Sequence, residues 1–199
     1  WCESTSTYGD GDLGTPGTTN DSCDVPTLAT DIQEGDIVIS EIMHTPQVVS
    51  DFRGEWFEIH NATSKSLSIK GLEVLGTSGT GFVIESEETI PAGGYAVFTT
   101  RPESLNGGIR DIFEIYNTDE LRLYSAGTIG VYSPSGELLD EVNYDSTESY
   151  PTANGSSLSL GVLSVDVNDM YSFWCESTST YGDGDLGTPG TTNDSCDVP

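Results

Sequence analysis

Apolar and polar residues alternate along most of this chain from residue 36 onward, a pattern typical of β-strands with one covered face. The alternating segments are short and rich in β-branched and aromatic residues. We expect strands over residues 36–43, 55–61, 67–76, 81–86, 95–100, 120–125, 129–133, 137–144 and 156–161. Residues 101–116 break the alternation, and there the sequence predicts a short helical turn and a crossover.

Glycine, proline and asparagine separate these segments, as in "TSGTG", "PAGG", "SPSGE" and "TANGSS". These residues permit the tight reversals that join neighbouring antiparallel strands. Strands that follow one another at such short intervals bury their apolar faces by packing in two layers. We therefore expect an all-β fold, an immunoglobulin-like antiparallel β-sandwich.

The two ends of the chain have the same sequence. "WCESTSTYGDGDLGTPGTTNDSCDVP" fills residues 1–26 and, without one substitution, residues 174–199. Identity of this kind favours an array of near-identical repeats, with an engineered or fortuitous duplication as the alternative. On this interpretation residues 1–26 are the tail of a preceding identical repeat and act as an interdomain connector. Residues 27–199 are then one sandwich module with its own C-terminal tail, residues 174–199.

Charge narrows the classes of partner. The 199 residues include 33 acidic and 6 basic ones, which gives a formal net charge of −27. Such a field repels phosphate backbones and anionic lipids, so we expect no nucleic-acid partner. A net charge of this size suits an extracellular environment of high ionic strength, in which cations screen the charges. No apolar run of about 18 residues and no signal-peptide pattern occurs, so we expect no membrane span here and any targeting signal outside this sequence.

The four cysteines fall as one pair in each copy of the repeated segment, Cys2 with Cys23 and Cys175 with Cys196. This spacing differs from a metal-binding C-x-x-C cluster and favours disulfides in an oxidising compartment. In an array of identical repeats, the cysteines of every repeat must form the same pairing. The first interpretation is therefore pairing within each copy, and the alternative is a Cys23–Cys175 bond that closes a whole module.

The repeated segment carries tryptophan, two cysteines and proline, which flexible linkers usually lack. We therefore expect residues 1–26 to be ordered. The start of each copy is expected to complete the last strand of its own sandwich, while the later part reaches toward the next module. On this hypothesis residues 10–26 lie against the base of the 27–199 sandwich.

Four blocks follow one another along the chain: "GDIVISEIMHTP", "GEWFEIHNATSKSLSIKGLEV", "IPAGGYAVFTT" and "FWCESTSTYGDGDLGTPGTTN". Together they resemble the lamin-tail domain family in its bacterial, secreted form, over about residues 35–193. The resemblance implies an immunoglobulin-like sandwich that serves as a non-catalytic module of large extracellular or cell-surface proteins. Relatives in animal nuclear lamins are implicated in chromatin binding, but the strong negative charge of this sequence departs from them.

No motif of a catalytic nucleophile or a zinc protease occurs, and we expect no enzymatic activity. His44 and His60 are expected to be solvated or on an edge strand. Glu55 and Glu58 flank two aromatic residues, but residues three apart on a strand point to opposite faces. A paired-carboxylate acid–base site is therefore not expected there.

Calcium is the cofactor that the acidic loops suggest. "DGDLG" spaces Asp183 and Asp185, and again Asp10 and Asp12, as D-x-D-x-G, and calcium selects carboxylate oxygens from glycine-rich loops. If the tail folds back on the strands, Glu41, Glu55 or Glu58 completes the shell. The alternative is a solvated acidic turn whose glycines permit positive φ.

These observations lead to one functional hypothesis and one rival. The first is a structural repeat of an extracellular fibre, stalk or surface filament, whose partners are neighbouring identical repeats or subunits linked through disulfide-pinned tails. The rival is an adhesive module that binds glycans or cell surfaces through aromatic residues such as Trp56, Tyr150 and Tyr171. For Trp56, in an alternating strand, the core is the preferred location.

Overall fold

The computed structural model describes residues 2–20, 25–145 and 149–199, and its regular structure is almost entirely β-strand. The first α-helix is a single turn, α1 (Asp51–Gly54), and a 3-10 turn covers Tyr171–Phe173. Within these ranges no helix has the length and apolar character needed to cross a membrane.

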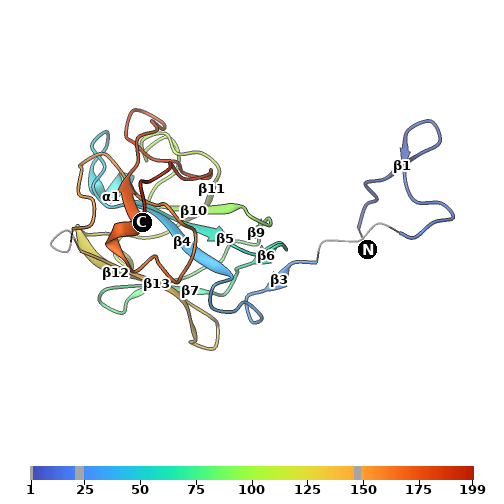
Figure 1. Ribbon diagram of the computed structural model, residues 1–199, viewed down its shortest axis with the longest axis horizontal. Helices are drawn as coiled ribbons and strands as arrows, with labels where there is room; N and C mark the ends of the chain where they lie inside the picture. Colours follow the sequence, from blue (N-terminus) through green and yellow to red (C-terminus); the bar gives the residue numbers. More distant parts are fainter. Residues whose placement is uncertain (1, 21–24, 146–148) are drawn as a thin grey trace.

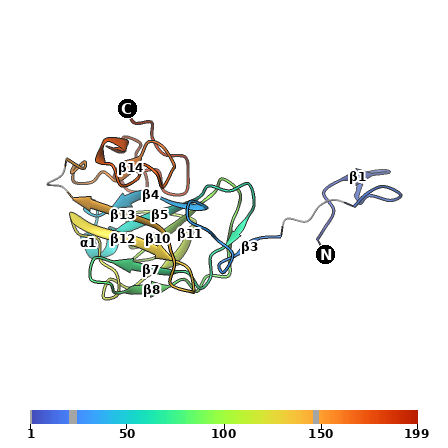
Figure 2. The same cartoon turned by 60° about the horizontal axis from the view of Figure 1, so that its bottom comes forward.

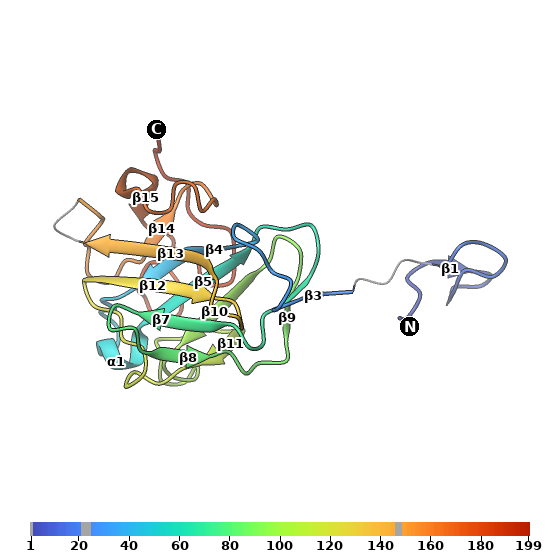
Figure 3. The same ribbon diagram turned by 90° about the horizontal axis from the view of Figure 1, so that it is seen from below.

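Two sheets pack face to face and confirm the predicted immunoglobulin-like sandwich (Figure 3). The larger sheet has the order β11 (Ile112–Ile115), β10 (Tyr95–Thr99), β5 (Trp56–Asn61), β4 (Ile37–Met43), β14 (Leu158–Leu160), β15 (Trp174–Glu176). The smaller sheet has the order β13 (Leu138–Asp145), β12 (Ala126–Tyr132), β7 (Glu73–Gly76), β8 (Gly81–Val83). Neighbouring strands in both sheets are antiparallel, except that β10 and β11 are parallel.

A short third sheet closes one end of the sandwich. It joins β3 (Thr27–Leu28), β6 (Leu67–Ser68) and β9 (Thr89–Ile90), with β3 parallel to β6. The N–H of Thr27 donates to the carbonyl of Ser66 at 2.9 Å. The sandwich therefore begins at Thr27, directly after the first copy of the repeated segment.

The main core lies between the two sheets, and β4 and β5 are buried along their whole length. Phe57 stacks on Phe98 with ring centroids 4.8 Å apart. A second, smaller cluster on the other face of the larger sheet contains Trp56, which is fully buried. The preference for Trp56 as a core residue is therefore confirmed. Strands covered on both faces explain why two short segments hold so many apolar side chains.

Residues 120–125 were expected to form a strand, and this prediction is wrong. Leu121 and Leu123 do point into the core, as the alternation requires, and each is 2% exposed. However, the N–H of Leu123 donates to Oε2 of Glu55 at 3.1 Å instead of pairing with another strand. In 101–116 the crossover is present, and the N–H groups of Leu105 and Asn106 bond to the carbonyl of Pro102 in one helical turn, after which β11 follows.

Both histidines are buried, so the expectation of solvated or edge positions is wrong. His60 lies in β5, which has β4 and β10 on its two sides, and the centroid of its ring is 4.7 Å from that of Tyr95. His44 stacks on Tyr144 with ring centroids 5.9 Å apart. Burial lowers the pKa of both imidazoles, which favours neutral rings that pack as core side chains.

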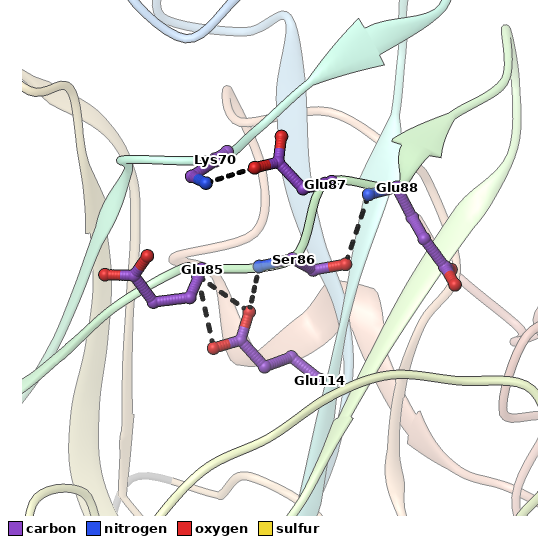
Figure 4. Close-up of polar contacts among 6 residues, drawn as sticks. All are labelled: Lys70, Glu85, Ser86, Glu87, Glu88 and Glu114. Carbon is purple, nitrogen blue, oxygen red and sulfur yellow. Dashed lines mark hydrogen bonds and ion pairs between the residues drawn. The ribbon is translucent and has the colours of Figure 1, made fainter.

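The β11 edge of the larger sheet carries a network of acidic residues (Figure 4). The Glu114 carboxylate accepts hydrogen bonds from the backbone N–H groups of Glu85 and Ser86, both at 2.9 Å. Lys70 forms an ion pair with Glu87 in the same segment. The Glu114 side chain thus joins β11 to the segment that follows β8.

The two copies of the repeated segment have different positions in the fold. The second copy lies on the sandwich, over β4 and β14 (Figure 2). In the first copy, β1 (Thr7–Tyr8) and β2 (Asp12–Leu13) form a hairpin that lies apart from the sandwich (Figure 1). The expected contact of residues 10–26 with the base of the following sandwich does not form within one chain for residues 10–20.

Glu55 generates a prediction about the pH dependence of stability. Burial raises its pKa from 4.5 to about 7, and burial raises the pKa of Asp140 from 3.8 to about 6. The folded state therefore holds these protons more tightly than the unfolded state. The free energy of unfolding should fall as the pH rises from about 4.5 to about 7.

The substitution Glu55→Gln should make this fall smaller, because the amide keeps an acceptor for Leu123 but does not ionise. Urea unfolding at several pH values and fixed ionic strength measures the change. Glu137→Gln, at an exposed turn position, is the control and should keep the wild-type slope. Equal slopes for wild type and Glu55→Gln would contradict the prediction.

Candidate functional site: the face that binds the repeated tail

The outer face of the larger sheet receives residues 177–199, which follow β15, and we call it the tail-docking face. It is formed by Glu41, Trp56 and Glu58 of the two central strands, by Gln47 and Val48 after β4, and by Ser157 beside β14. Figure 2 shows the C-terminal residues gathered on this face, away from β7 and β8. The tail is thus a third layer of the domain.

Two glutamates stand at the centre of this face because of a β-bulge. The register between β4 and β5 shifts between Ile39 and Glu41, so that Glu41 pairs with Glu58. Ser40 is the extra residue; if the register of Ile39 and Ile59 continued through it without a shift, Glu41 would stand opposite Phe57. Directly opposed residues share one face of a sheet. Both carboxyl groups therefore point toward the tail, and both side chains are fully buried.

Glu41 accepts hydrogen bonds mainly from the tail. Thr188 donates to it twice, from its N–H at 2.9 Å and from Oγ1 at 2.7 Å. The hydroxyl of Ser177 donates at 3.0 Å, and the hydroxyl of Ser157 makes a further short hydrogen bond. Burial raises the pKa of Glu41, while these hydrogen bonds oppose that shift. A carboxylate with this many donors is satisfied without a metal.

Glu58 binds the next turn of the tail. The N–H of Gly190 donates to Oε2 at 2.6 Å, and the hydroxyl of Ser40 donates to Oε1 at 2.7 Å. Burial raises the pKa of Glu58 well above its ordinary value, and the neighbouring Glu41 raises it further. The tail thus takes the place of water at these two carboxyl groups and supplies most of their donors.

The hairpin of the tail is fixed by Asp185, which is 5% exposed. Its carboxylate accepts hydrogen bonds from the N–H groups of Gln47 and Val48 at 3.1–3.3 Å. Leu186 makes two backbone hydrogen bonds to the segment before β14, from its N–H to the carbonyl of Gly155 at 2.7 Å and from the N–H of Ser157 to the Leu186 carbonyl at 3.0 Å. These bonds form an isolated parallel bridge that fixes the hairpin beside β14.

Tyr181 supplies the apolar contact of the hairpin. Its ring meets Trp56 edge-on at 5.7 Å, and the indole Nε1–H donates to the tyrosine hydroxyl at 3.0 Å. The adjacent Gly182 lies against Gly108. A Cβ atom added to Gly108 would lie 2.8 Å from the Cα of Gly182. A side chain on either glycine would separate the hairpin from the loop that it contacts.

The ends of the tail are joined to each other and to β14. Cys175 in β15 forms a disulfide with Cys196, as predicted, which excludes the alternative Cys23–Cys175 bond. Asn193 donates from Nδ2 to the carbonyls of Ser40 and Leu160 at 2.8 and 3.0 Å. For the first copy, the predicted Cys2–Cys23 pairing involves Cys23, which lies outside the described residues.

The acids predicted to bind calcium do not come together in one cluster. Glu41 lies under Thr188 and Asp185 on the N–H groups of Gln47 and Val48, whereas Glu55 lies beside Leu123 and 3.7 Å from Arg122. Asp183 is exposed at the tip of the second hairpin, and Asp10 and Asp12 are exposed in the first. Among the described residues, no group of three or more His, Cys, Asp and Glu could hold a metal ion. The candidate acids therefore lie in separate places in the fold, and calcium binding stays a prediction.

Sequence reasoning found the two central glutamates but missed their partners. A carboxylate buried in an apolar strand needs hydrogen-bond donors or a cation as partner, and the calcium hypothesis chose the cation. The structure uses Ser157, Ser177, Thr188 and the Gly190 N–H instead. The available signal was the run of hydroxyl residues in "SSLSL", which is unusual for a buried strand.

The duplication supplies a matched control for the role of Asp185. The substitution Asp185→Ala removes the acceptor of two backbone N–H groups and should lower the free energy of unfolding by about 1–3 kcal/mol. Asp12→Ala changes the same residue in the exposed first copy, and its effect should stay within about 0.5 kcal/mol. Urea unfolding of both variants tests this, and equal effects would contradict the assigned role of Asp185.

The calcium prediction is checked by thermal melting with and without a chelator at fixed ionic strength. If Asp183 and Asp185 bind calcium, chelation lowers the Tm, because a ligand held only by the folded state stabilises it. Replacing both residues with asparagine should then remove the sensitivity to chelator. An unchanged wild-type Tm would show that these residues form a solvated turn and a hydrogen-bond acceptor.

Comparison with known families agrees with the resemblance but gives it a smaller extent. The family model of the lamin tail domain matches residues 30–146, so the fourth block quoted above lies outside the match. The strands β14 and β15 and the docked tail also lie beyond it. A comparison with curated protein sequences gives no match. From its sandwich fold and the matched region, which covers more than half of its length, the chain belongs to the lamin tail domain family.

Proposed function

We propose that this chain is a structural repeat of an extracellular fibre, stalk or surface filament, in which identical modules follow one another head to tail. The proposal rests first on the unbroken identity of residues 1–26 and 174–199. The Cys175–Cys196 disulfide supports an oxidising, extracellular environment. The net charge of −27 suits high ionic strength and argues against a nucleic-acid partner. Membership of a family of immunoglobulin-like domains without catalytic function supports a non-enzymatic role.

One observation carries the proposal: the second copy is an integral layer of its own sandwich. Its threonine, glycine and aspartate contacts reach strands β4 and β5 and the loop after β4, across more than a hundred residues of sequence. A segment that closes one module so completely is expected wherever such a module ends. The first copy is then the last part of a preceding module of the same kind.

The distance between modules follows from the same contacts. In a continuing array, Pro199 would be followed by the counterpart of Thr27, which is anchored at Ser66. Cys196 is anchored to β15 by its disulfide with Cys175, so Asp197, Val198 and Pro199 are the connector. Four peptide steps span at most about 14 Å. Successive sandwiches are therefore close neighbours, which favours a stiff filament over separate beads.

The rival function, an adhesive module, is supported by an open cavity beside the tail hairpin. The cavity has a volume of about 670 Å³ and is lined by Arg110, Asp111, Tyr181, Asp183 and other residues of the same two loops. Tyr171 is 52% exposed elsewhere on the surface, whereas Tyr150 is buried. A mixed-charge cavity suits a polar ligand such as a glycan, but its walls belong to the contact between the tail and its own sandwich.

Electron microscopy of the native full-length product separates the two functions. The structural proposal predicts regular filaments whose axial repeat equals one module, because the connector is too short for free rotation. Flexible strings of separate domains would contradict it and favour the adhesive module. Binding of the purified chain to a glycan array is the complementary measurement for the rival.

A further inference from the structure

The two copies of the repeated segment fold into the same hairpin. In the first copy the N–H of Gly11 donates to Tyr8 at 3.1 Å, and that of Gly14 donates to Ser6 at 2.7 Å. The equivalent bonds of the second copy, from Gly184 to Tyr181 and from Gly187 to Ser179, measure 3.0 and 2.7 Å. Three glycines also take left-handed φ angles in both copies: 55°, 114° and 76° at Gly9, Gly11 and Gly17, and 47°, 132° and 80° at Gly182, Gly184 and Gly190.

The copies differ in what covers them. Tyr8 is 45% exposed and Leu13 is 59% exposed, whereas the equivalent Tyr181 and Leu186 are partly buried on the sandwich. Asp185 is buried at the docking face, but the equivalent Asp12 is exposed. Since the sequence and the hairpin are the same, this difference comes from the presence or absence of a docking face. The first copy has the shape of a docked tail without the surface that a docked tail covers.

We propose that the N-terminal copy is a docking element whose partner is the tail-docking face of a second copy of this sandwich. In that position Tyr8 packs on Trp56, Thr15 donates to Glu41, and the N–H of Gly17 donates to Glu58 of the partner molecule. These are the contacts of Tyr181, Thr188 and Gly190 within one chain. The inference rests on the head-to-tail function proposed above and names its contact surface.

Preorganisation favours this contact. The hairpin of the first copy already has the turns and glycine conformations of the docked state, so docking orders little additional backbone. When the partner's own tail is displaced, its face presents the two carboxyl groups that the tail had covered, and the first copy carries the same donors as the second. The affinity of the face for the two copies should therefore be similar when both are presented in the same way.

The numbers of tails and faces determine when the contact forms. This chain holds two tails and one docking face, and its own C-terminal tail is tethered to that face by the chain itself. A tethered segment competes at a high effective concentration. The N-terminal copy should therefore occupy the face of another molecule when the C-terminal copy of that molecule is weakened.

Paired substitutions in the full-length chain test the proposal. Tyr181→Ala with Thr188→Val weakens the C-terminal copy and leaves the docking face and the N-terminal copy unchanged. We expect the wild type to stay monomeric and this variant to form head-to-tail oligomers at micromolar concentrations. Their mass in size-exclusion chromatography with light scattering should be at least twice the 21.2 kDa of one chain.

The same changes in the first copy form the matched control. Adding Tyr8→Ala and Thr15→Val to the variant should return it to a monomer, while Tyr8→Ala with Thr15→Val alone should leave the wild-type mass unchanged. If Tyr181→Ala with Thr188→Val does not fold, as judged by circular dichroism, the milder Thr188→Val is tested over a range of concentrations. A labelled, oxidised peptide with the sequence of residues 1–26 gives a second measurement. It should bind the weakened variant at least tenfold more tightly than the wild type.

A folded variant that stays monomeric and does not bind the peptide would overturn the proposal. So would oligomers that persist after Tyr8→Ala and Thr15→Val, or a monomer in which the N-terminal copy occupies its own sandwich. Failure of the filament proposal is a different result, seen in the electron microscopy of the native product. Oligomerising variants without native filaments would contradict the fibre but keep the docking contact.

Discussion

Two buried carboxyl groups under a folded-back tail hold the outer layer of this domain together. Glu41 and Glu58 face each other across β4 and β5, and each receives donors from the segment that follows β15. A carboxyl group in such a site is costly without partners, and the tail supplies them from backbone and hydroxyl groups. The larger sheet and the tail therefore depend on each other for these buried hydrogen bonds.

The fold could be predicted from the sequence because most strand segments alternate between apolar and polar residues and are separated by turn residues. The presence of strands β4 and β5, the hairpin of β12 and β13, and the burial of Trp56 followed from this pattern. It failed at residues 120–125, where Leu121 and Leu123 alternate correctly but a glutamate, not a strand, accepts the N–H of Leu123. Alternation reports which side chains are buried and does not report where the backbone finds its hydrogen bonds.

The candidate site could be predicted from the sequence only in part. The bulge at Ser40 brings Glu41 opposite Glu58, and a one-residue change of register is invisible in a pattern of period two. Asp185 and Thr188 lie more than a hundred residues from their partners, so no local spacing relates them. The acids in the loop suggested a cation, whereas Asp185 accepts hydrogen bonds from backbone N–H groups and Asp183 is exposed.

The Cys175–Cys196 bond has a mechanical consequence for a chain that carries tension. Force applied through Thr27 and Pro199 would reach Cys196 and pass through the sulfur atoms directly to Cys175 in β15, which is paired with β14. The residues between the two cysteines, about 70 Å of extended backbone, are then outside the path of the load. The segment that contacts Glu41, Glu58 and Trp56 would keep these contacts while such a chain is stretched. Reduction of this one bond would place the hairpin in line with the force and release its length.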